Sequence, residues 1–255
     1  MIILETIDVA FTMFSAIPMP QIPWTRDNMR YTLCAFPLIG AVIGLACWTA
    51  WAVCGFFGVP GILTGAVLCL IPVLITGGIH LDGYADTCDA LASHAAPERK
   101  QEILKDPHVG SFAVIRLCGL FVLTLALWTS LPEYRTLPIL LGFCVSRTLS
   151  GLAVASFPLA KDTGLAHTFA EAADRRRVRA GLIVLDVLLC AGMLISGIGG
   201  GLAALAAHLV FAYYCDMSKR QFGGLSGDLA GWFLVQAEKW MLIVLVAWEY
   251  VEVLL

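Results

Sequence analysis

Long runs of apolar residues dominate this chain of 255 residues and restrict the folds that it can adopt. A helix that crosses the hydrocarbon core of a bilayer needs about 20 mostly apolar residues, and several runs reach that length. Charged residues make up 14% of the chain, against about a quarter in soluble globular domains, and the mean hydropathy is +0.84. The sequence therefore predicts an all-α, polytopic integral membrane protein with a single domain over residues 1–255.

Seven membrane-spanning helices are expected from these runs, with boundaries good to a few residues. The predicted spans are residues 32–54, 61–79, 109–131, 137–158, 180–197, 201–215 and 231–254, with a tight turn at 132–135. Residues 1–20 place Ile7, Phe11 and Phe14 at helical spacing, but this segment is too short and too charged to be a span. We expect an amphipathic helix there, either interfacial or re-entrant.

Basic residues gather in the polar segments on one side of the predicted spans. This side holds Arg26, Arg30, Arg99, Lys100, Lys105, Lys161, Arg175, Arg176, Arg177, Arg179, Lys219 and Arg220, whereas the other side holds Arg135. The positive-inside rule makes the basic side cytoplasmic. We therefore expect segments 77–112 and 216–231 to share the cytoplasmic face of the inner membrane.

Three carboxylates follow the second predicted span. Asp82, Asp86 and Asp89 stand at i, i+4 and i+7, so a helix would place them on one face. Like charges at this spacing repel, and a bound divalent cation would offset the cost. Carboxylate oxygens suit Mg²⁺, Mn²⁺ or Ca²⁺. The alternative is a solvated acidic face outside the membrane, which the glycines and apolar residues among these charges disfavour.

A glycine-rich stretch lies just before the last predicted span. Backbone amides at Gly223, Gly224, Ser226 and Gly227 could cradle phosphate oxygens, and Asp228 could complete a metal site. The alternative is a flexible loop that leaves Asp228 near a helix N-terminus, where a carboxylate is favourable in any case. Its expected position on the same face as the three carboxylates favours the functional interpretation.

Several cationic side chains are candidate phosphate ligands. Lys105 and His108 precede the third predicted span, and Arg147 lies inside the fourth, where a charge usually faces a polar cavity or a partner. His80, beside the carboxylates, is a candidate base or support for a metal ligand. Arg116, Lys239 and Glu238 also lie in predicted spans, without a firm role.

Other reactive side chains are expected to be structural. His208 lies on an apolar face, and the nine cysteines are scattered through apolar runs without metal-ligand spacing.

The candidate residues together suit attack on a phosphate ester, because they combine clustered carboxylates that can hold Mg²⁺ with glycine-rich loops and cations. No Walker motif, Rossmann fingerprint or Ser–His–Asp spacing appears in the sequence.

Residues 77–91, which read Gly-Gly-Ile-His-Leu-Asp-Gly-Tyr-Ala-Asp-Thr-Cys-Asp-Ala-Leu, resemble the signature of the cobalamin synthase (adenosylcobinamide-GDP ribazoletransferase) family. Further segments that are similar to this family are 17–20, 36–40, 105–112 and 223–228. The resemblance covers nearly the whole chain. Departures are mild, with Ser226 where Thr is usual and Cys88 where a small residue such as Ala is common.

The resemblance implies a Mg²⁺-dependent membrane transferase that joins α-ribazole or its 5′-phosphate to adenosylcobinamide-GDP. GMP leaves, and adenosylcobalamin or its 5′-phosphate forms. On this interpretation one or two Mg²⁺ ions are held by Asp82, Asp86, Asp89 and Asp228, and one of the first three or His80 accepts the hydroxyl proton. Phosphate oxygens would be held by Lys105, His108, Arg147 and the glycine-rich stretch.

Partners beyond these substrates would be the lipid bilayer but no nucleic acid. A homo-oligomer or an association with other cobalamin-assembly enzymes is left open. Two alternative classes are a CDP-alcohol phosphotransferase-like transferase and a cation transporter. The first requires Ala-Arg after the Asp-Gly pair, whereas Ala85 is followed by Asp86 here, and the second usually shows paired repeats, which are not found.

Overall fold

The computed structural model describes residues 2–132, 136–160 and 163–254. The predicted turn at 132–135 and the cations Arg135 and Lys161 therefore lie wholly or partly outside the described residues. The helices are α1 (Ile2–Phe14), α2 (Arg26–Met29), α3 (Thr32–Phe56), α4 (Gly61–Thr76), α5 (Ile79–Ala92), α6 (Pro97–Ile103), α7 (Ser111–Ser130), α8 (Thr136–Ser156), α9 (Leu165–Ala172), α10 (Arg175–Ile195), α11 (Ile198–Phe222) and α12 (Gly227–Glu252). No strand forms among the described residues, so the all-α prediction is confirmed.

Six of the described helices are long and apolar enough to cross a membrane, namely α3, α7, α8, α10, α11 and α12. The bent pair of α4 and α5 raises the number to seven if it counts as one span. The expected polytopic membrane protein is thus confirmed, with a span number that agrees with the prediction.

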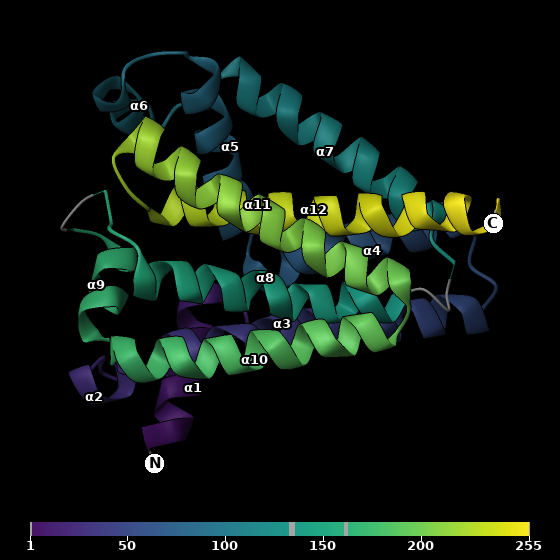
Figure 1. Ribbon diagram of the computed structural model, residues 1–255, viewed down its shortest axis with the longest axis horizontal. Helices are drawn as coiled ribbons and strands as arrows, with labels where there is room; N and C mark the ends of the chain where they lie inside the picture. The colour runs from purple at the N-terminus through teal and green to yellow at the C-terminus, as the bar shows by residue number, and fades with distance from the viewer. Residues whose placement is uncertain (1, 133–135, 161–162, 255) are drawn as a thin grey trace.

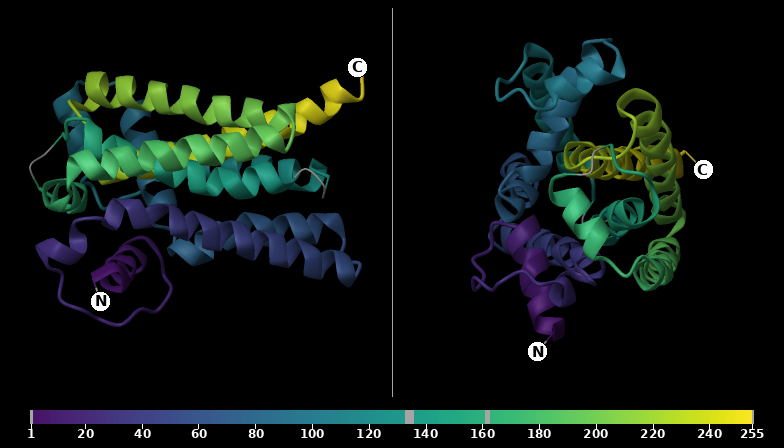
Figure 2. Two further views of the ribbon diagram at one scale, coloured as in Figure 1. Left: turned by 60° about the horizontal axis from the view of Figure 1, so that its bottom comes forward. Right: turned by 90° about the vertical axis from the view of Figure 1, so that its left-hand side faces the viewer.

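The second predicted span, 61–79, needs correction because α4 ends at Thr76. Gly77 and Gly78 adopt φ angles of 63° and 80°, a left-handed conformation that is easy for glycine, and the chain turns by 96° between α4 and α5. The carboxylate stretch consequently forms a helix of its own. In the end-on view of Figure 2, α5 runs across the direction of the long helices, so it does not continue the path of α4.

The last spans also begin or end beyond their predicted limits. α10 starts at Arg175 because Asp174 caps it, accepting a hydrogen bond of 3.2 Å from the Arg177 amide. α11 continues to Phe222, where Gly223 ends it with a φ of 77°. Both helices therefore extend into segments that were expected to be polar loops.

Helix α8 lies at the centre of the bundle, where it packs against α3, α10, α11 and α12 (Figure 1). Most of its residues are buried. Its tightest contact is with α3, where a Cβ on Gly40 would lie 2.3 Å from the carbonyl oxygen of Phe143. α1 packs against α3 and crosses the long helices steeply (Figure 2), as an interfacial helix would.

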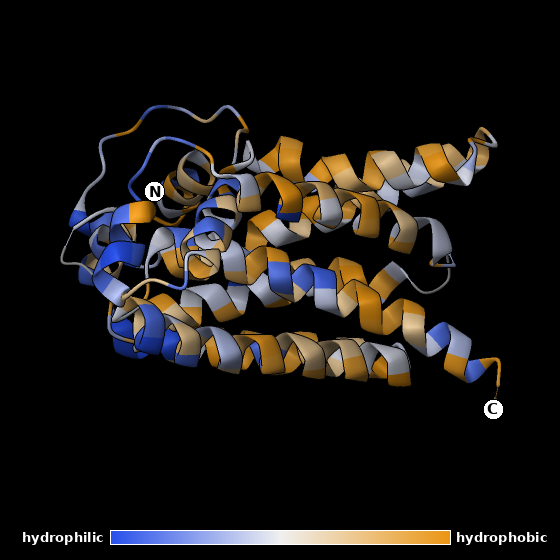
Figure 3. Ribbon diagram, turned by 90° about the horizontal axis from the view of Figure 1, so that it is seen from above, coloured by the Kyte–Doolittle hydropathy of each residue, from blue (hydrophilic) through white to orange (hydrophobic). Residues whose placement is uncertain are grey.

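Hydrophilic residues gather at one end of the bundle, and apolar residues cover most of its length (Figure 3). The short helices α2, α6 and α9 lie at this polar end with the start of α10 (Figure 1). An ion pair of 2.9 Å joins Arg30 to Asp174, and the Lys100 ammonium lies 2.6 Å from Oε1 of Gln221. The described basic segments therefore share one end of the molecule, as predicted.

Candidate functional site

Helices α5 and α12 cross in close contact through two glycines. A Cβ on Gly83 would lie 2.7 Å from the carbonyl oxygen of Asp228, and one on Gly231 would lie 2.9 Å from the carbonyl oxygen of His80. Real Cβ atoms do not approach backbone this closely, so both positions require glycine. This crossing brings the start of α12 to the carboxylate helix, although the two are far apart in the sequence.

The four acidic residues expected to bind metal meet at this crossing. The pKa of Asp86 is raised to about 6, first because the carboxyl group is partly buried and then because Asp82, Asp228 and Asp89 place negative charge around it. Asp82 is exposed, and the other three side chains are only partly covered. The structure therefore brings the four residues close enough for their charges to repel, while their role as metal ligands stays a prediction.

This donor set fits a hard divalent cation. Its ligand atoms are carboxylate oxygens, which Mg²⁺ prefers, and a cation would relieve the repulsion that raises the pKa of Asp86. Next to it, Asp82 and Asp228 line a cavity of about 170 Å³ whose other walls include Phe14, Phe36 and Phe169. The site therefore combines an acidic edge with an aromatic chamber.

Asp89 has a structural role that the sequence interpretation missed. Its Oδ2 accepts a hydrogen bond of 2.7 Å from the Gly110 amide, and its Oδ1 accepts one of 2.8 Å from the Ala113 amide. Both amides lie at the start of α7, where they have no partner within the helix. Asp89 thus caps α7 across a gap in the sequence, and each oxygen keeps a second lone pair for a metal.

The glycine-rich stretch, residues 223–227, packs closely against the segment that follows α8. Gly224 runs against the segment after α8, where a Cβ would lie 2.6 Å from the Ala160 nitrogen. A short parallel bridge joins Leu159 and Leu225 there. Ser226 caps α12 by accepting a hydrogen bond of 3.3 Å from the Leu229 amide, and Gly227 borders the aromatic chamber. A phosphate-binding role for Gly223, Gly224, Ser226 and Gly227 stays a prediction.

The predicted phosphate ligand Arg147 already has an acidic partner. Its guanidinium is buried and forms an ion pair with Glu238 of α12, and the Ser146 hydroxyl donates a hydrogen bond of 2.9 Å to the same carboxylate. Lys105 and His108 are exposed in the loop before α7, and His108 Nδ1 lies 2.7 Å from the Asp106 carboxylate. Contacts of these three cations with phosphate stay predictions.

His80 lies between two cavities. It borders the aromatic chamber and also a second cavity of about 90 Å³, which Arg147, Glu238 and Lys239 line. Burial and the charge of Arg147 lower the pKa of His80 to about 3, so its imidazole is neutral at physiological pH. Its Nε2 is buried without a hydrogen-bond partner among the described residues. A neutral imidazole with a free nitrogen can accept or donate one hydrogen bond to a substrate.

Two cations without an assigned role approach the carboxylate helix from other helices. Arg116 of α7 and Lys239 of α12 both lower the pKa of Cys88, although burial keeps that pKa above its usual value. Cys88 directly precedes Asp89. Both positive charges therefore lie near α5, and only their positions inside apolar runs, where a charge is costly, signalled them in the sequence.

These features define a multi-pass helical membrane protein with a carboxylate site at the polar end of its bundle. The model of the cobalamin-5-phosphate synthase family matches residues 6–246, so the chain belongs to that family.

Relatives named adenosylcobinamide-GDP ribazoletransferase support this assignment. The protein from Lachnoclostridium phytofermentans is 44% identical over 236 residues, which cover 92% of this chain and 90% of the relative. The protein from Clostridium botulinum is 31% identical over 90% of this chain and 92% of its own length. The protein from Geobacillus kaustophilus is 34% identical over 88% of both chains. No solved structure matches the chain.

Proposed function

We propose that this protein is an adenosylcobinamide-GDP ribazoletransferase that works at the cytoplasmic face of the inner membrane. It joins α-ribazole or its 5′-phosphate to the phosphate carried by the corrinoid, and GMP leaves. Family membership supports the reaction class. The observation that carries the choice of site is the meeting of four carboxylates around Asp86.

Mg²⁺ is the proposed cofactor, held by Asp82, Asp86 and Asp228, with Asp89 at the edge of the site through its remaining lone pairs. When bound, Mg²⁺ would neutralise oxygens of the diphosphate and so favour the departure of GMP. The crossing at Gly83 and the cap formed by Asp89 hold α5 against α12 and α7, and so fix the helices that carry these carboxylates relative to one another.

The remaining groups of the site would bind and orient the substrates. A ribazole hydroxyl forms the new P–O bond while the bond between the two phosphates of the GDP group breaks, and the hydroxyl proton passes to a carboxylate at the site. The flat aromatic base of ribazole suits the chamber lined by Phe14, Phe36 and Phe169. The neutral His80 imidazole at its wall can orient the nucleoside by a hydrogen bond.

The distribution of basic residues indicates how the protein is oriented in the membrane. Basic residues of α2, α6, α10 and α11 lie at the same end of the bundle as the carboxylates, and such residues are enriched on the cytoplasmic side of membrane proteins. Both substrates would then reach the site from the cytoplasm.

The test is a turnover assay on purified protein in detergent. Adenosylcobinamide-GDP and α-ribazole 5′-phosphate are supplied with Mg²⁺ or with EDTA, and GMP release is followed. We expect GMP only when both substrates and Mg²⁺ are present, and a loss of at least about 100-fold in Asp86→Asn. Asp27→Asn, an exposed acid of α2, is the matched control and should keep full activity. Folded protein that releases no GMP would contradict the proposed reaction.

A further inference from the structure

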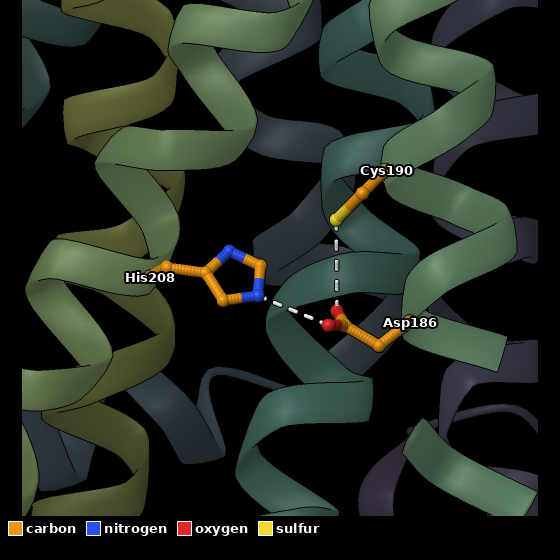
Figure 4. Close-up of side chains that lie close together, drawn as sticks. All are labelled: Asp186, Cys190 and His208. Carbon is orange, nitrogen blue, oxygen red and sulfur yellow. Dashed lines mark hydrogen bonds and ion pairs between the residues drawn. The ribbon is translucent and has the colours of Figure 1, made fainter. Parts of the chain in front are cut away.

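Three side chains from α10 and α11 form a cluster, which the proposed reaction does not use. Figure 4 shows Asp186 between Cys190, one turn further along α10, and His208 of α11. Their ligand atoms, one carboxylate oxygen, one sulfur and one ring nitrogen, all lie within 4.8 Å of one another. We call these three residues the Asp–Cys–His cluster.

Hydrogen bonds orient the imidazole toward the carboxylate. His208 Nδ1 lies 2.8 Å from the carbonyl oxygen of Ala204, so Nδ1 carries a proton and donates it. The other ring nitrogen, Nε2, lies 3.0 Å from Oδ2 of Asp186. In a neutral imidazole Nε2 is then an acceptor, and two acceptors that face each other need either a proton or a metal cation between them.

We propose that the Asp–Cys–His cluster binds a transition-metal ion of the Zn²⁺ class. Nitrogen, sulfur and carboxylate oxygen are the ligands that Zn²⁺ takes, and three protein ligands leave its fourth position open. A ligating histidine usually donates its other N–H to a carbonyl or carboxylate group, as His208 does. The Cys190 sulfur lies 3.8 Å from Oδ1 of Asp186, near the separation of two ligands on one tetrahedral ion.

The competing arrangement is an imidazolium–carboxylate pair without metal. It would satisfy Asp186 and His208, but it would give Cys190 no more than a weak hydrogen bond. A metal ion uses all three groups. The carboxylate, the thiolate and a divalent ion also sum to zero charge, which suits a position midway along two apolar helices.

The surroundings leave room for a fourth ligand. An open groove of about 320 Å³ runs between α10 and α11 beside Cys190, with Leu194, Gly201 and Ala204 on its walls. All three residues of the cluster are half-buried, and Cys190 lines this groove. It also differs from the carboxylate site in its chemistry, because sulfur and nitrogen select softer ions than Mg²⁺. A bound ion would join α10 to α11 halfway along their length.

The experiment uses Co²⁺, which replaces Zn²⁺ and reports its ligands by absorption. Full-length protein in detergent is stripped with a chelator, supplied with excess Mg²⁺ to occupy the carboxylate site, and titrated with Co²⁺. We expect a cobalt–thiolate charge-transfer band that Zn²⁺ abolishes by displacement. Cys190→Ser should remove this band, whereas Cys215→Ser, a half-buried thiol elsewhere on α11, should keep it.

The other two ligands give a second readout. Asp186→Asn and His208→Gln should each weaken Co²⁺ binding by at least about tenfold, the loss that even an outer hydrogen-bond partner can cause. If folded protein shows no thiolate band, or Cys190→Ser keeps it, the metal assignment is wrong and the cluster is a hydrogen-bonded pair.

Alkylation of the unmodified protein gives a readout that does not depend on whether a variant folds. Zn²⁺ should slow the reaction of Cys190 with a small thiol reagent, with Cys215 as the internal control. Equal rates with and without Zn²⁺ would equally overturn the proposal.

Discussion

Replacing Asp86 by Asn should stabilise the metal-free protein. The carboxyl pKa is about 6 in the folded chain against 3.8 for the free group, a rise of about two units. At 1.36 kcal/mol for each unit this gives an upper limit of about 3 kcal/mol at pH 8. Because the Asp86 side chain is only partly buried and water screens the charges of its neighbours, we expect about 1 kcal/mol. This corresponds to a rise of about 3 °C in apparent Tm for a chain of this size.

The pH dependence has a defined sign. Between pH 4 and 6 the folded chain holds a proton on Asp86 that the unfolded chain has released, so wild-type stability falls as the pH rises through this window. Above pH 6, Asp86 is ionised in both states, and the destabilisation that its charge causes no longer changes with pH. Asp86→Asn has no such proton, so its advantage over wild type should grow from pH 4 to 6 and then level off.

Mg²⁺ should reverse the order of the two proteins. At 100 times its Kd a ligand adds about 2.7 kcal/mol to the stability of the protein that binds it, and Asp86→Asn should gain much less. Apparent Tm is measured by tryptophan fluorescence in detergent, with and without Mg²⁺, at one heating rate. Asp27→Asn should follow wild type throughout. An equal Mg²⁺ shift in wild type and Asp86→Asn would refute the assignment of this carboxylate to a metal site.

Four further substitutions test the surroundings of the site. Gly83→Ala should lower stability by about 1–3 kcal/mol and weaken Mg²⁺ binding, because its Cβ would collide with the backbone of α12, and both are read from Tm with and without Mg²⁺. Asp89→Ala should cost about 1–2 kcal/mol by removing the cap of α7, and this loss should persist in EDTA, unlike that of a pure metal ligand. Glu238→Gln should cost about 3–5 kcal/mol by leaving Arg147 buried and unpaired, and the double variant with Arg147→Met should recover much of the folded yield in size-exclusion chromatography. Phe169→Leu should raise the KM for α-ribazole 5′-phosphate several-fold while the KM for adenosylcobinamide-GDP stays within twofold, and equal changes in both would argue against the chamber as the base site.

Features that depend on neighbouring residues in the sequence were predictable. Run length and composition predicted the spans, and the i, i+4, i+7 spacing predicted the face of α5 that carries the carboxylates. The break at Gly77 and Gly78 was missed because the apolar run continues to Ile79, although two adjacent glycines are a recognisable signal for the end of a helix.

Features that depend on packing between distant segments were not predictable. Arg147 was expected to face a polar cavity or a partner, but the pattern could not indicate that Glu238, on another helix, pairs with it; its role in phosphate binding stays a prediction. His208 was expected to be structural because it lies on an apolar face, and its neighbour Asp186 could not be foreseen because the two meet only when α10 packs against α11. Spacing along one chain says little about which helix faces are paired.

The carboxylate site shows how the fold maintains a repulsive cluster. Left to itself, α5 would relieve the crowding of its charges by moving away from Asp228. The Asp89 cap ties one end of α5 to α7, and the glycine crossing at Gly83 ties the other end to α12. The glycine crossing brings backbone against backbone, so it cannot relax by a change of side-chain rotamer, and the two hydrogen bonds of Asp89 to α7 hold its carboxylate in one orientation. We therefore expect that a cation which relieves the repulsion would bind more tightly here than to mobile carboxylates.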